Sequence, residues 1–148
     1  MKKTFVALLV MLAVGVTPVL ANDKTNDKAT EALKKEFVGA ESVKWTDLGD
    51  YKMALFIFNE YRIEAYFNNE GELEGFDRYI SINQLPLEVL RSFSKHFAKA
   101  AVSDILEISN AEGTSYRLNV ETQNGQYHVK ISSTGAILKT VKGESKPF

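Results

Sequence analysis

Apolar and polar residues alternate with a period of two along two long stretches of the chain, within 49–73 and within 113–137. This period is typical of a β-strand that buries one of its faces. In the first stretch, Asn59 and Glu60 form a two-residue connection, which pairs residue 58 with 61, 56 with 63 and 54 with 65. In the second, Asn124-Gly125 is a strong signal for a tight hairpin turn. Both stretches are therefore predicted to form β-hairpins.

The pairing in the first hairpin places seven apolar residues on one face, which we assign to the core. They are Ala54, Phe56, Phe58, Tyr61, Ile63, Ala65 and Phe67. In the second hairpin the alternation predicts that Tyr116, Leu118 and Val120 point inward, with Arg117, Asn119 and Glu121 outward.

Helical periodicity precedes each hairpin region. Ala29, Leu33 and Phe37 recur every four residues, and Val89, Phe93 and Phe97 follow with the same spacing, 60 positions later. One apolar stripe of this kind is typical of a helix that packs on a core. The spacing predicts helices near 27–38 and 84–98.

The two hairpin regions also match one another at an offset of 64 residues, so that positions 49 and 71, both glycine, fall on two further glycines at 113 and 135. Such self-similarity indicates a repeated architecture. The predicted fold class is α+β, with two tandem α-β4 repeats, each a helix packed on a four-stranded antiparallel meander sheet. The repeats are expected at 22–80 and 81–148.

The N-terminus has the composition of a secretory signal peptide. Two lysines precede an apolar run from Phe5 to Leu20, and small residues end at Ala21. We expect cleavage after Ala21, so that residues 1–21 are a signal peptide and the mature protein is periplasmic or secreted, without membrane insertion. A chain with no cysteine has no disulfides, and a formal net charge of −1 gives no reason to expect a nucleic-acid partner.

The sequence resembles the PepSY-like, beta-lactamase-inhibitor-like family of periplasmic proteins. The matching positions are the segment 32–37, the strand 43–45, the hairpin core, Gly71, and Leu85-Pro86 before the second helix. The resemblance covers nearly the whole mature chain and implies a tandem α-β4 fold in the bacterial envelope. It implies no established activity. In the inhibitor that gives the family part of its name, the sheet face contacts an enzyme.

The outward face of the first hairpin is the candidate functional surface. It carries large apolar residues where the second hairpin has charged or polar ones, and family members usually have polar residues there. The predicted partner-binding residues are Met53, Leu55, Ile57, Arg62 and Tyr66. Apolar, aromatic and arginine side chains are typical of interface cores. Two alternatives remain: another part of the chain covers this face, or a one-residue register slip makes it the core.

Other candidate chemistry has simpler structural explanations. The acidic segment after Asn68 lacks the ligand spacing of a calcium loop, and is better explained as a turn that needs Gly71. His96 and His128 are the only histidines and show no zinc-binding spacing. Trp45 is expected in the core. We predict no catalytic residues, metal site or cofactor.

The sequence thus predicts an exported, non-catalytic binding or inhibitor-like module with an unknown protein partner. One alternative is an envelope enzyme or metal-binding protein. Another is a self-associating structural protein that uses the same apolar face.

Overall fold

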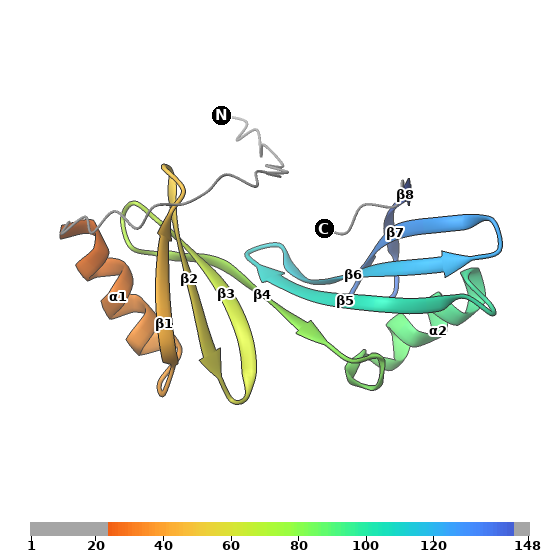
Figure 1. Ribbon diagram of the computed structural model, residues 1–148, viewed down its shortest axis with the longest axis horizontal. Coiled ribbons are helices and arrows are strands. Elements are labelled where there is room, and N and C mark those ends of the chain that lie inside the picture. The colour runs from red at the N-terminus through yellow and green to blue at the C-terminus, as the bar shows by residue number, and fades with distance from the viewer. Residues whose placement is uncertain (1–23, 144–148) are drawn as a thin grey trace.

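The computed structural model describes residues 24–143, and its eight antiparallel strands form one continuous sheet (Figure 1). The sheet is a meander, because each strand pairs with its neighbours in the sequence, in the order β1 to β8. The first half comprises α1 (Lys24–Glu36), β1 (Glu41–Asp47), β2 (Tyr51–Phe58), β3 (Tyr61–Asn68) and β4 (Leu73–Ile80). The rest comprises the 3-10 turn η1 (Ile82–Gln84), α2 (Leu87–His96), β5 (Ala101–Asn110), β6 (Gly113–Thr122), β7 (Gly125–Ser132) and β8 (Ile137–Gly143).

The predicted fold class of two tandem α-β4 repeats, each with its own sheet, is wrong. β4 pairs with β5 from Gly75↔Asn110 to Ile80↔Ile105, so the strands on either side of α2 belong to the same sheet. Separate four-stranded sheets would leave β4 and β5 as two further edges with unpaired N–H and C=O groups. Pairing them satisfies those groups and leaves only β1 and β8 as edges.

The apolar core lies between the sheet and the helices in two clusters. One packs α1 against the first strands through Ala29, Leu33, Phe56 and Phe67, among others. The other packs α2 against β5–β7, and its members include Val89. Figure 1 shows the two helices apart from one another, each beside its own half of the sheet.

The register predicted for the first hairpin is confirmed. Phe58 pairs with Tyr61, and the pairing of residue 56 with 63 and of 54 with 65 follows. Five of the seven predicted core residues of this hairpin are buried, whereas Phe58 and Tyr61 are half-buried. The register fixes which side chains point away from the helices, and it excludes the one-residue slip.

The predicted signal peptide at 1–21 lies outside the described residues. Between residues 24 and 143, no helix is long and apolar enough to cross a membrane.

Candidate functional site: the open sheet face

The five predicted partner-binding residues all lie on the sheet face opposite the helices, which we call the open face. Met53 pairs with Tyr66, and Ile57 with Arg62, so each pair lies side by side on neighbouring strands. Leu55 lies between them on β2. The structure therefore brings these residues together on one surface.

Further apolar side chains lie on the open face beyond the first hairpin, on β4 and β5. Tyr79 pairs with Leu106, and Asp77 pairs with Ile108, all on the open face. Tyr79 has 57% of its surface exposed and Ile57 has 39%, whereas Leu106 and Ile108 are half-buried. Tyr79, Leu106 and Ile108 are not among the residues predicted from sequence, because they join this face only through the pairing of β4 with β5. The available signal was their spacing in the sequence: Leu106 and Ile108 are two residues apart and so share one face of a strand, opposite to that of Ile105.

A groove of about 720 Å³ crosses the open face between β2 and β5. Met53, Tyr66 and Ile108 contribute apolar surface to it, and two acids, Glu64 and Asp77, line it beside them. These acids are direct cross-strand neighbours. Like charges in this arrangement destabilise a sheet, so this part of the face is not optimised for stability.

The electrostatics of the groove follow from that pairing. Burial and the nearby charge of Glu64 raise the pKa of Asp77 to about 6, although Arg117 and a hydrogen bond from Tyr66 oppose the shift. Burial, followed by the charges of Asp77 and Glu64, raises the pKa of the Tyr66 phenol. At the rim, Arg62 Nη2 lies 3.3 Å from Glu64 Oε1. At neutral pH the groove therefore holds a carboxylate that burial disfavours.

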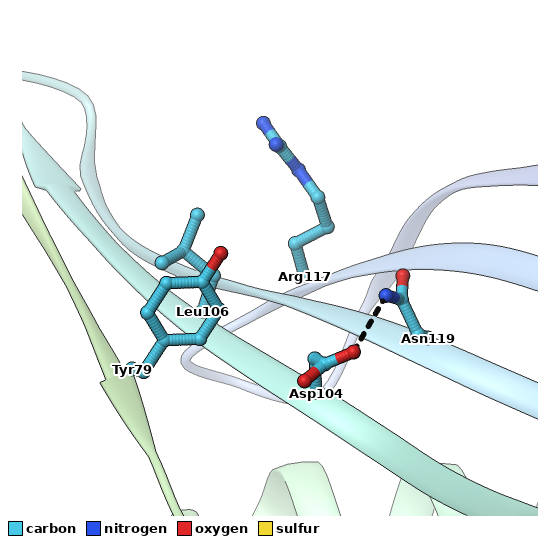
Figure 2. A pocket seen from close by; sticks show the side chains of 5 residues that line it. All are labelled: Tyr79, Asp104, Leu106, Arg117 and Asn119. Atoms are coloured by element: carbon cyan, nitrogen blue, oxygen red, sulfur yellow. Dashed lines mark hydrogen bonds between the residues drawn. The ribbon is translucent and has the colours of Figure 1, made fainter. Parts of the chain in front are cut away.

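A second, much smaller hollow lies where β4, β5 and β6 meet (Figure 2). Tyr79 and Leu106 line one side, and Arg117 projects from β6. Asn119 Nδ2 donates to Asp104 Oδ2 at 3.2 Å. The hollow has a volume of about 20 Å³, which is enough for one water molecule but not for an organic ligand.

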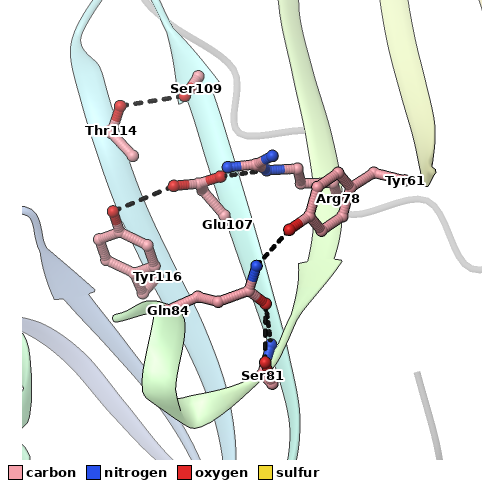
Figure 3. Close-up of polar contacts among 8 residues, drawn as sticks. All are labelled: Tyr61, Arg78, Ser81, Gln84, Glu107, Ser109, Thr114 and Tyr116. Atoms are coloured by element: carbon pink, nitrogen blue, oxygen red, sulfur yellow. Dashed lines mark hydrogen bonds and ion pairs between the residues drawn. The ribbon is translucent and has the colours of Figure 1, made fainter. Parts of the chain in front are cut away.

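On the helix side of the sheet, polar residues form a structural network between the two core clusters (Figure 3). Arg78 Nε lies 2.5 Å from Glu107 Oε2, and the Tyr116 hydroxyl donates to Glu107 Oε1 at 3.1 Å. The Arg78 guanidinium lies 4.6 Å from the Tyr61 ring centroid, and Gln84 Nε2 donates to the Tyr61 hydroxyl. These groups satisfy one another, so the network is best explained as structural.

The remaining candidate residues lie apart. His96 Nδ1 bonds the Ser92 carbonyl on α2, whereas His128 Nδ1 contacts Asn119 on the open face. Within residues 24–143, no group of three or more His, Cys, Asp or Glu side chains is placed to hold a metal ion.

Two further sequence predictions concern structural residues. Trp45 packs against the first core cluster, with its ring centroid 5.5 Å from that of Phe67. The Asn68 side chain accepts bonds from the Glu70 and Glu72 amides, which closes the turn before β4.

Solved structures with the same architecture come from Bacteroides species. A BLIP-like protein from Bacteroides fragilis is 23% identical, with a TM-score of 0.71 over 82% of this chain and 91% of that chain. A DUF2874 family protein from Bacteroides ovatus is 21% identical, with a TM-score of 0.71 over 81% and 89%. A protein from Bacteroides eggerthii, assigned provisionally to the periplasm, is 20% identical, with a TM-score of 0.69 over 78% and 87%.

At these identities the likeness shows the fold. It supports the BLIP-like part of the resemblance found in the sequence, and none of the three is described as PepSY-like. No protein-family model and no curated protein matches the chain.

Proposed function

We propose that this chain is an exported, non-catalytic binding module whose open face contacts a protein partner in the periplasm. The observation that carries the proposal is the set of apolar side chains that this face exposes on both sides of the charged residues of β3, with Ile57 on β2 and Tyr79 and Leu106 on β4 and β5. Large exposed apolar side chains reduce solubility unless they serve an interaction. The BLIP-like and provisionally periplasmic structures with this fold support the same cellular setting.

The composition of the face favours a protein partner over a small molecule. Tyrosine, methionine and arginine are the types enriched in interface cores, and Tyr66, Tyr79, Met53 and Arg62 all occur here. The groove that Met53 and Tyr66 line is open on a sheet surface, whereas small-molecule sites enclose most of their ligand. A protein surface that lies across several strands matches this shape better.

Ile57→Glu provides the test, since the side chain is exposed and its replacement should leave the core intact. The variant replaces an apolar contact with a charged carboxylate that must lose water on binding, so we expect at least about tenfold weaker retention of the partner from envelope extract. Val38→Glu is the matched control, because Val38 is 77% exposed and follows α1, away from the open face.

Equal retention by wild type, Ile57→Glu and Val38→Glu would contradict the proposal. Sedimentation of the purified protein separates a second copy from a different partner. A wild-type dimer that Ile57→Glu dissociates would replace the heterologous partner with a second copy of this chain.

A further inference from the structure

Three cations lie side by side on the open face, across β6, β7 and β8. Arg117 pairs with Lys130, and Lys130 pairs with Lys139, so one basic side chain follows another on successive strands. Neighbouring strands are about 4.8 Å apart. Like charges directly opposite one another destabilise a sheet. This row, which we call the cationic row, therefore costs stability in the isolated protein.

Among the described residues, acidic groups lie near one end of the cationic row, at Arg117, but not near the two lysines. β7 and β8 contain no aspartate or glutamate. Across residues 24–143, neither Lys130 nor Lys139 has an ion pair, while Arg117 is near Asp77. Asp104 on β5 lines the same hollow as Arg117 and accepts a hydrogen bond from Asn119. The two lysines thus present unneutralised charge to the solvent.

Protection of a sheet edge does not explain the arrangement. Lysine on an edge strand discourages pairing with other sheets, and this accounts for Lys139 on β8. Arg117 and Lys130 lie on the interior strands β6 and β7, where no such protection is needed. Arg117 is near Asp77, so the charge that calls for a different explanation is that of Lys130.

The same line across the sheet is apolar at its other end. Leu106 pairs with Arg117 on one side and with Tyr79 on the other, so the order from β4 to β8 is two apolar residues followed by three cations. Four strand-to-strand steps of about 4.8 Å span roughly 19 Å, which is the length of about six extended residues.

We infer that the cationic row binds an acidic segment of the partner protein, whose apolar residues contact Tyr79 and Leu106 while its carboxylates contact Arg117, Lys130 and Lys139. This inference rests on the proposed function and specifies the chemistry of the partner. A protein segment fits better than a membrane or nucleic acid, since the chain has a net charge of −1 and the row is narrow and partly apolar.

A synthetic peptide tests the inference directly. The probe is the blocked octapeptide GILSEDEG, compared with the neutral GILSQNQG and the basic GILSKRKG, each titrated into the purified protein and followed by backbone amide chemical shifts. We expect the acidic peptide to shift amides of β4 to β8 on this row, including Tyr79 and Lys130. Binding should weaken severalfold between about 20 mM and about 300 mM salt.

The variant Lys130→Gln/Lys139→Gln should bind the acidic peptide about threefold to tenfold more weakly, because each exposed ion pair contributes modestly. Lys142→Gln is the matched control, since Lys142 also lies on β8 but pairs with Tyr127 on the other face. It should leave the affinity unchanged.

Three results would overturn the inference: equal binding of the neutral peptide, no binding at low salt, or an equal loss in Lys142→Gln. Binding of anionic phospholipid vesicles, but not of the acidic peptide, through the same lysines would also overturn it, in favour of a membrane surface. If the peptide fails while Ile57→Glu still abolishes partner retention, this inference is wrong and the proposed function stands. If Ile57→Glu also has no effect, the proposed function fails too.

Discussion

Asp77 is the residue of the open face that most clearly lowers the stability of the folded protein at neutral pH. Its carboxyl group is partly buried beside Glu64 and Tyr66, and its pKa is raised to about 6. A raised pKa means that the folded protein binds the proton more tightly than the unfolded chain does. The protonated Asp77 carboxyl therefore contributes its full stabilisation of the folded state below about pH 4, and this contribution is lost as the pH rises through about 6.

Asp77→Asn should accordingly stabilise the protein at neutral pH. The amide resembles the protonated acid and removes the burial of charge, so the free energy of unfolding should rise by about 1 kcal/mol at pH 7.5. The gain should shrink towards zero near pH 4. Urea unfolding of both proteins at several pH values measures it. A variant that is less stable at pH 7.5 would show that the charged form is the favoured one.

At the scale of elements, two glycines let the helices approach the hairpin turns. Gly71 and Gly135 have φ of +83° and +87°. A Cβ at Gly135 would lie 2.6 Å from the Glu88 carbonyl oxygen of α2, and one at Gly71 would lie 2.6 Å from Lys28 Cβ of α1. Each turn therefore needs glycine both for its backbone conformation and for close packing.

Gly135→Ala should destabilise the protein by about 3 kcal/mol, since it combines left-handed backbone strain with overpacking. Gly39→Ala separates the two causes, because Gly39 has φ of +93° but open space around it. It should cost about 1 kcal/mol through strain alone. Thermal unfolding compares the two variants, and equal losses would show that the contact with α2 does not matter.

The hairpins and helices could be predicted from sequence, because their signals are local. The two-residue turn at Asn59 fixed the register of β2 and β3, and the spacing from Ala29 to Phe37 located α1. The pairing of β4 with β5 has no such signal, since η1 and α2 separate these strands. Tyr79 and Leu106 lie on these two strands and were therefore not predicted, whereas Met53 and Tyr66 lie within one hairpin and were.

At the scale of the whole molecule, the continuous sheet should make the two core clusters unfold together. The single tryptophan, Trp45, packs on the α1 cluster and reports on it, whereas Val89 is fully buried in the α2 cluster. Val89→Ala should destabilise the protein by about 2 kcal/mol through the cavity it leaves. The Trp45 fluorescence transition and the far-UV circular dichroism transition should then shift by the same amount. An unchanged Trp45 transition would show that the halves unfold independently.

Retention of envelope proteins by the immobilised chain tests the claim that the open face binds a protein. We expect a partner that wild type and Val38→Glu retain equally and that Ile57→Glu retains at least about tenfold less, through loss of apolar contact. A partner retained equally by all three proteins would contradict the claim, because binding would then not depend on this face.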